Sequence, residues 1–306
     1  IAGFLWGFTA GQAFIFMGFS YTIFAGLGFP VRINMEWLDY SKKFWELVLI
    51  GFLYYVAIWA DKFIFWYSFE GVQVNWGFYA FSDYDLPFFL AYVTLIPSLA
   101  VFLLNIETSF YQEYRAFFEY IIAKMPYDKI HEKNKNMQRV VRNSLLDILK
   151  MQGLVTFLVV YFAPEILAGL DVMSELSTRI LRIASLSVFF HANIMIISIF
   201  ILYLDMRKDV LIAIGAFAVL NIIFTLISLR LGPMYYGSGQ LLSSAISFVI
   251  CVLYLRYRFK NLEFLTFAKQ PIMHKVDDDE GLLARIDGGY GKYIDLRKAR
   301  KKAKEK

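Results

Sequence analysis

Seven apolar stretches, each long enough to cross a bilayer, take up most of this 306-residue chain. The hydrocarbon core of a membrane is roughly 30 Å thick and needs about 20 consecutive apolar residues in a helix. Hydrophobic residues make up 58% of the chain, more than a soluble domain of this size can cover. The sequence therefore predicts an all-α polytopic membrane protein with seven transmembrane helices, expected at 4–29, 44–66, 86–106, 151–169, 180–203, 210–229 and 236–257.

Basic residues between these spans gather on alternate sides. The connectors after the first, third, fifth and seventh spans hold most of the 31 Lys and Arg, whereas the connector 67–85 has none and carries three acidic residues. Connectors rich in Lys and Arg stay in the cytoplasm, so we expect a cytoplasmic C-terminus and place Ile1 outside. If the complete protein begins in the cytoplasm, an odd number of helices precedes Ile1, and five would give a total of twelve.

Polarity divides the chain into three regions. We expect a transmembrane helix with a cytoplasmic connector over 1–43, a six-helix membrane bundle over 44–260, and a polar cytoplasmic tail over 261–306. The basic end of that tail suits anionic headgroups or another protein better than nucleic acid.

Within the bundle, the segment 107–150 is the longest polar insertion between spans, and its apolar residues recur at helical spacing. This pattern predicts two amphipathic helices broken near Met125 and Pro126. The insertion is either a connector on the membrane surface or a docking platform for a cytoplasmic partner. The candidate docking residues are Arg115, Lys124, Lys129, Arg139 and Arg142.

Motifs for bond-making chemistry are missing from the sequence. It has no phosphate-binding loop, no dinucleotide fingerprint, no nucleophile elbow and no zinc-ligand spacing. Cys251 stands alone, and His131, His191 and His274 are far apart. We therefore expect neither a metal site nor a cofactor, and we do not expect an enzyme.

Asp61 and Lys62 are the informative exceptions to the apolar spans. An ionisable group in hydrocarbon costs roughly 2.5–3.5 kcal/mol on insertion scales and usually faces protein or water. The two residues either face a central cavity that binds a cation, a proton or a sugar, or Lys62 reaches the interface while Asp61 bonds a neighbouring helix. Adjacent residues point about 100° apart on a helix, so the two need not pair with each other.

Four further residues are candidates for a substrate path. Tyr55 and Trp59 offer aromatic faces for a sugar, although an aromatic belt at the membrane interface explains such residues equally well. Asn193 and Asn221 can hydrogen-bond a sugar or bridge two helices.

Several runs of the sequence resemble the PelG family of Pel exopolysaccharide transporters. These are AIWADKFIFW at 57–66, SDYDLPFFLAY at 82–92, FLLNIET at 102–108, ILKMQG at 148–153, and LGP with GSG between 231 and 239. The resemblance spans about residues 1 to 270. That family is similar to oligosaccharide flippases and multidrug exporters, in which two six-helix bundles enclose a cavity, so the chain would be the sixth helix and the C-terminal bundle of a twelve-helix transporter.

The resemblance implies export of an N-acetylgalactosamine-rich polysaccharide across the bacterial inner membrane for a biofilm matrix. It also implies a cytoplasmic glycosyltransferase, PelF, at the entrance and the companion membrane proteins PelD and PelE, with PelD sensing cyclic di-GMP. Three alternatives stay open. They are a lipid-linked oligosaccharide flippase, with Lys62 and Arg182 as candidate cations; a cation-coupled drug exporter, with Asp61 as the coupling carboxylate; and a membrane scaffold for the glycosyltransferase.

Overall fold

The computed structural model describes residues 2–28, 36–172 and 174–268. It divides into two units, Ile1–Phe259 and Lys260–Lys306, and the described part of the second unit contains the short helix α12 (Leu262–Ala268). Most of the tail predicted for 261–306 therefore lies outside the described residues.

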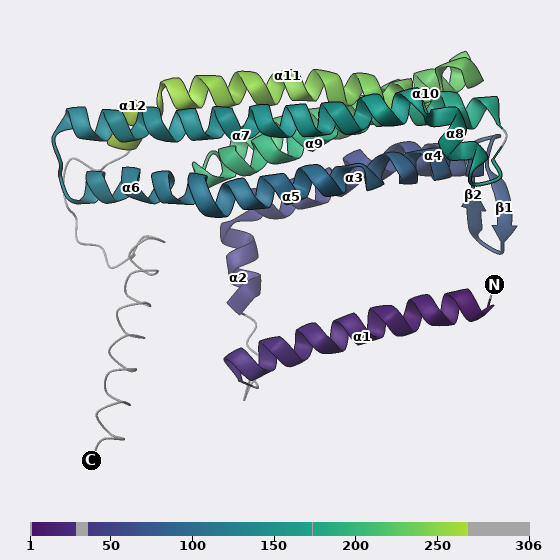
Figure 1. The fold of residues 1–306 in the computed structure, drawn as a ribbon, viewed down its shortest axis with the longest axis horizontal. Coiled ribbons are helices and arrows are strands. Elements are labelled where there is room, and N and C mark those ends of the chain that lie inside the picture. The colour runs from purple at the N-terminus through teal and green to yellow at the C-terminus, as the bar shows by residue number, and fades with distance from the viewer. Residues whose placement is uncertain (1, 29–35, 173, 269–306) are drawn as a thin grey trace. The chain divides into compact units, whose positions relative to one another are not determined.

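Helices dominate the first unit (Figure 1). The only strands in the part of the chain that the structure describes form one short antiparallel hairpin between α3 and α4. The elements are α1 (Ala2–Leu27), α2 (Glu36–Lys43), α3 (Trp45–Trp66), β1 (Val72–Asn75), β2 (Phe78–Ala80), α4 (Ser82–Val93), α5 (Leu95–Asn105), the π-helical turn Ile106–Phe110, α6 (Tyr111–Ile122), α7 (Tyr127–Tyr161), α8 (Ala163–Ala168), α9 (Glu175–Tyr203), α10 (Arg207–Leu231), the 3-10 turn Pro233–Tyr235 and α11 (Ser238–Lys260).

Seven helical segments of the described chain are long and apolar enough to cross a membrane, which confirms the prediction of seven spans. The fourth span differs from the predicted 151–169, because α7 ends at Tyr161 and a separate helix, α8, begins at Ala163 with Pro164 in its first turn. Proline has no amide hydrogen and its ring clashes with the preceding turn, so it suits the first turn of a new helix rather than the interior of an old one.

The polar segment 107–150 forms two antiparallel helices, α6 and α7, and the break between them falls at 123–126, as predicted. Neither helix is separate from the spans. Helical structure runs with few interruptions from Ser82 to Ile122, and α7 continues without a break to Tyr161. A connector that lies flat on the membrane surface would run at a steep angle to the spanning helices. Both α6 and α7 instead continue in the direction of the spanning helices to which they are joined (Figure 1). We call residues 111–150 the α6–α7 arm.

The length of α7 indicates how far the arm extends. Its 35 residues span roughly 50 Å at about 1.5 Å per residue, against a hydrocarbon core of about 30 Å. A buried stripe at spacings of three and four residues holds α7 against α5, α6 and α9; it consists of Ile130, Asn134, Met137, Val141, Ser144, Ile148, Gln152 and Thr156. Since this stripe covers both the polar and the apolar half of α7, the arm is a rigid extension of the bundle.

The core of the bundle is built around α9, which contacts α4, α5, α7, α8 and α10. Helix α10, which also contacts α9, packs along α3. Aromatic rings fill the region between α3 and α4, where Phe65, Tyr84 and Phe88 are fully buried in one apolar cluster with Tyr236. This cluster fixes the position of α3 against α4 and thereby the surroundings of Asp61 and Lys62.

Candidate functional site

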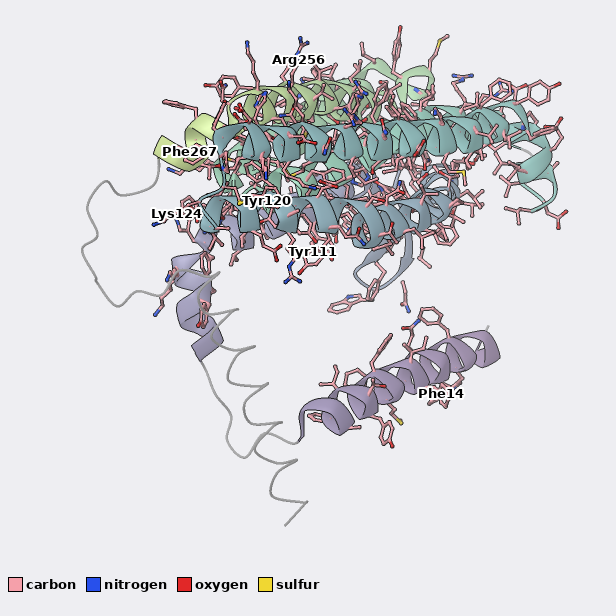
Figure 2. The ribbon with its side chains drawn as sticks, turned by 60° about the vertical axis from the view of Figure 1, so that its left-hand side comes forward. Phe14, Tyr111, Tyr120, Lys124, Arg256 and Phe267 are labelled. Atoms are coloured by element: carbon pink, nitrogen blue, oxygen red, sulfur yellow. The ribbon has the colours of Figure 1, made fainter. Side chains whose placement is uncertain are left out.

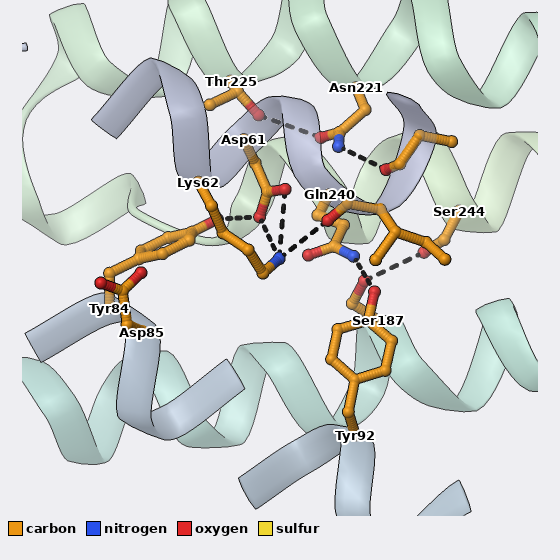
Figure 3. A network of polar contacts seen from close by, with 12 residues as sticks. Asp61, Lys62, Tyr84, Asp85, Tyr92, Ser187, Asn221, Thr225, Gln240 and Ser244 are labelled. Carbon is orange, nitrogen blue, oxygen red and sulfur yellow. Dashed lines mark hydrogen bonds and ion pairs between the residues drawn. The ribbon is translucent and has the colours of Figure 1, made fainter. Parts of the chain in front are cut away.

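Asp61 and Lys62 lie on the inner side of α3, with exposed fractions of 0% and 7%. The Lys62 Nζ donates to Asp61 Oδ1 and Oδ2 at 3.2 and 3.1 Å, and to the Ile58 carbonyl oxygen at 2.9 Å (Figure 3). The long lysine side chain turns back along its own helix to reach these oxygens. The two neighbours therefore do pair, although their positions on the helix did not require it.

Side chains of α4 complete the surroundings of the pair. The Tyr84 hydroxyl donates to Asp61 Oδ2 at 2.7 Å. The Lys62 Nζ lies 4.6 Å from the centroid of the Phe88 ring and 5.5 Å from that of Tyr92, within the range of cation–π attraction. Lys62 thus does not reach out to the interface; both charges are compensated inside the bundle.

Asn221 joins α10 to this part of α3. Its Nδ2 donates to the Ala57 carbonyl oxygen at 2.9 Å, one turn before Asp61, and its Oδ1 accepts from Thr225 Oγ1 at 3.0 Å. On α11, Gln240 Nε2 donates to the Tyr92 hydroxyl at 2.7 Å, while Gln240 Oε1 has no hydrogen-bond partner among the described residues. Four helices, α3, α4, α10 and α11, therefore meet in one polar network (Figure 3).

Close packing of α10 against α11 depends on Gly239. A Cβ atom at this position would lie 2.6 Å from the backbone nitrogen of Thr225 and 2.7 Å from its Cα. Such distances do not occur between real atoms without movement of one helix. Only glycine allows this approach, which brings Gln240 to Tyr92.

The six residues predicted for a substrate path do not form one site. Asp61, Lys62 and Asn221 belong to the same network, whereas Asn193 is buried on α9, where its Nδ2 donates to the Phe189 carbonyl oxygen. Tyr55 and Trp59 are exposed by 66% and 44%.

These two aromatic residues belong to an exposed ladder on the outer face of α3, which we define as Phe52, Tyr55, Trp59 and Phe63. Its members follow each other at spacings of three and four residues, so they lie on one face of the helix. The ring centroids of Trp59 and Phe63 are 6.4 Å apart. The ladder faces away from the buried Ala57, Asp61 and Phe65, whereas Lys62, seven residues after Tyr55, lies at the edge between the two faces of α3.

All five predicted docking residues are exposed on the arm or in the turn between its helices. Arg115 Nε bonds Glu119 at 2.6 Å along α6, and Arg139 bonds Asn136 at 3.4 Å along α7. Lys124 lies at the turn near Tyr120 (Figure 2). The arm therefore presents basic side chains on a fixed helical support.

Sequence reasoning missed the partners of Asp61 and Lys62 on α4. Tyr84, Phe88 and Tyr92 recur every four residues, and this aromatic spacing was a usable signal of one inward face. Gln240 is one of several polar residues inside the predicted spans that can hydrogen-bond a sugar or bridge two helices, but the sequence does not indicate that it reaches Tyr92. Among the residues that the structure describes, no three His, Cys, Asp or Glu side chains gather closely enough to hold a metal ion.

One protein-family model matches the chain over residues 1–267; it is PelG, described as "Putative exopolysaccharide Exporter (EPS-E)". No curated protein and no solved structure matches the chain.

Proposed function

The chain belongs to the PelG family of exopolysaccharide exporters, and on that premise we propose that it passes a Pel-type, N-acetylgalactosamine-rich polysaccharide from the cytoplasm to the periplasm. The family is one of exporters rather than of enzymes. In this proposal the protein lies in the bacterial inner membrane with a cytoplasmic C-terminus and contributes to a biofilm matrix.

The observation that carries the proposal is the aromatic ladder on α3. Phe52, Tyr55, Trp59 and Phe63 expose aromatic side chains along about half of a membrane-spanning helix, without a charged residue among them. A neutral acetylated sugar offers apolar ring faces and hydroxyl groups, which aromatic side chains with polar tips contact without holding tightly. We propose that successive sugar units move along this ladder.

The similarity of the family to two-bundle flippases supports a place for this path. The described helices would be the sixth helix and the C-terminal bundle of a twelve-helix transporter, and the ladder would face the cavity between the two bundles. The buried network of Asp61, Lys62 and Asn221 then holds α3 at the correct rotation for its outer face to line the cavity.

The ion pair argues against two of the alternative functions. A cation-coupled drug exporter needs a carboxylate that binds and releases its ion, but Asp61 already bonds Lys62 and Tyr84. A flippase for lipid-linked oligosaccharides needs a free cation for the diphosphate group, but of its two candidates the Lys62 ammonium is occupied by Asp61 and the Ile58 carbonyl oxygen. The other, Arg182, lies on α9, outside the network around Asp61, where its Nε donates to the Val160 carbonyl oxygen. Export of a neutral polymer that is driven by its own synthesis requires neither an ion-binding carboxylate nor a free cation.

Coupling to synthesis is the proposed role of the α6–α7 arm. A rigid arm with exposed Arg115, Lys124, Lys129, Arg139 and Arg142 suits an acidic surface on a cytoplasmic glycosyltransferase. By the family resemblance this partner is PelF, in a complex with PelD and PelE that responds to cyclic di-GMP. If partner binding by the arm were the whole function, the protein would be a membrane scaffold for the glycosyltransferase.

Two experiments separate transport from scaffolding. The first measures secreted polysaccharide in cells that carry Tyr55→Ala or Trp59→Ala, at equal protein levels in the membrane. Phe157→Ala on the exposed face of α7 is the matched control. We expect both ladder variants to reduce secretion while the control does not; equal secretion in all three would refute a path along α3.

The second experiment measures co-purification of the glycosyltransferase with the full-length protein. We expect loss of the partner when the five basic residues of the arm become Gln, and retention when Arg230, which lies at the opposite end of α10 from its cytoplasmic start, becomes Gln. Retention in the arm variant would remove the arm from partner binding. Loss of secretion in the ladder variants with the partner still bound would favour transport over scaffolding.

A further inference from the structure

The hairpin between α3 and α4 exposes an apolar surface that the proposed function does not use. From Gly71 to Phe81 the chain has no Asp, Glu, Lys, Arg or His. Val72, Val74 and Phe78 are each about two-thirds exposed or more, and Trp76 at the turn is 90% exposed. A soluble loop of this length normally carries charged or small polar residues, so this composition calls for a physical explanation.

The two faces of the hairpin differ. Val72 pairs with Ala80, and Gln73 pairs with Tyr79, so these two pairs project to opposite sides of the ribbon. The Tyr79 ring packs against Tyr67, with centroids 5.2 Å apart. The face of Gln73 and Tyr79 is thus polar and partly covered. The register then shifts at Val74, so that Asn75 pairs with Phe78 on the side of Val72 and Ala80. Asn75 is the one polar side chain on that side, which is otherwise apolar and open.

The connections of the hairpin determine its depth. It is joined to the end of α3 at Trp66 and to the start of α4 at Ser82, so it lies level with the ends of two spanning helices. Trp66 Nε1 donates to Asp85 Oδ2 at 2.8 Å, and Asp85 also accepts from the Phe81 backbone amide, which ties the two helix ends together. In Figure 1 the strands run across the direction of the helices. Strands in this orientation lie along the membrane plane rather than across it.

We infer that this hairpin lies in the interfacial zone of the bilayer, with Val72, Val74, Trp76 and Phe78 among the lipid headgroups and upper acyl chains. Tryptophan is enriched at this depth, and an uncharged ribbon enters it without desolvating an ion. An isolated two-stranded hairpin is at best marginally stable in water, so burial of its apolar face in lipid also stabilises it.

Lipid fits this face better than a sugar chain does. The two valines have no group that bonds a hydroxyl, and the hydrogen-bonding side chain of Gln73 projects to the opposite face from Val72. Asn75, which pairs with Phe78, already accepts through Oδ1 from the Trp76 backbone amide at 2.7 Å. The inference holds whatever polysaccharide the protein exports, because it rests on the position and composition of the hairpin alone.

Site-directed spin labelling of the full-length protein in phospholipid nanodiscs tests the inference. In a background from which the native cysteines, Cys251 among them, have been replaced by Ala, single cysteines replace Gln73, Val74 or Phe78 and carry a nitroxide. Collision rates with oxygen, which concentrates in lipid, and with a water-soluble nickel chelate are then compared. Phe157 on a spanning helix and Lys129 on the arm give the lipid and water references.

We expect the ratio of oxygen to nickel collisions to be several-fold higher at positions 74 and 78 than at position 73. Nickel access at 74 and 78 equal to that at Lys129 would overturn the inference in favour of an aqueous hairpin. Protection of these positions from both reagents would overturn it in favour of a covering protein segment. Because 74 and 78 lie on different strands, distortion by one label does not decide the outcome.

Discussion

Removal of one partner of the Asp61–Lys62 pair should destabilise the protein far more than removal of both. In Lys62→Met the Asp61 carboxylate loses its only close cation among the described residues, in a position with no exposed surface. In Asp61→Asn the Lys62 ammonium keeps the Ile58 carbonyl oxygen and two aromatic rings but loses its counter-charge.

Breaking a buried ion pair from one side costs about 3–5 kcal/mol, because an uncompensated charge stays in a low dielectric. We place Lys62→Met at the upper end, because its carboxylate retains only the Tyr84 hydroxyl. Asp61→Asn should cost less, because two ring faces and a carbonyl oxygen still stabilise the ammonium. The double variant replaces the pair by neutral groups of similar size and should lie within about 2 kcal/mol of wild type.

The assay is unfolding of the purified protein in mixed micelles of detergent and sodium dodecyl sulfate, followed by tryptophan fluorescence, for wild type, both single variants and the double variant. The coupling free energy is the double-variant effect minus the sum of the single effects. We expect the double variant to recover at least about 3 kcal/mol relative to that sum. Additive single effects would refute the interpretation of the pair as a compensated buried charge.

The same four proteins also report on function. Polysaccharide secretion that recovers in the double variant indicates that the path needs no charge at this position, as the proposed export of a neutral polymer requires. Secretion that stays lost in a stable double variant would mean that the charges act in transport itself, and would revive the cation-coupled exporter.

Two further substitutions, with Gly51→Ala as a control, test the packing around this network. Gly239→Ala places a Cβ against the Thr225 backbone and should lower the free energy of unfolding by about 1–3 kcal/mol. A Cβ at Gly51 meets nothing within 4 Å, so Gly51→Ala should raise the free energy of unfolding by about 0.5–1 kcal/mol through helix propensity. The same unfolding assay compares the two variants, and a similar loss of stability in both would contradict this prediction. Tyr84→Phe removes a hydrogen bond to a charged acceptor and should lower the free energy of unfolding by about 1.5–3 kcal/mol in the wild-type background. The loss should be much smaller in an Asp61→Asn background. An equal loss in both backgrounds would show that the hydroxyl does not act through Asp61.

Much of the architecture was readable from the chain itself. Span number and the break before Tyr127 follow from the length of apolar runs and from Pro126, which are local properties. The continuity of the arm with the spans was not predicted. Backbone hydrogen bonds continue through α7 whether its side chains are polar or apolar, so the loss of hydrophobicity before residue 150 suggested an end that the helix does not have.

The composition of the site needed the tertiary structure. The sequence identified Asp61 and Lys62 as unusual, because a charge inside a span is costly wherever it occurs. Whether they pair, and with which neighbours, depends on the rotation of α3 against α4, α10 and α11. Asn221 reaches Ala57 across 164 residues, and Trp59, two positions from Asp61, faces the other way. A sequence fixes the spacing of residues along one helix, but only the packing of several helices determines which face of each turns inward.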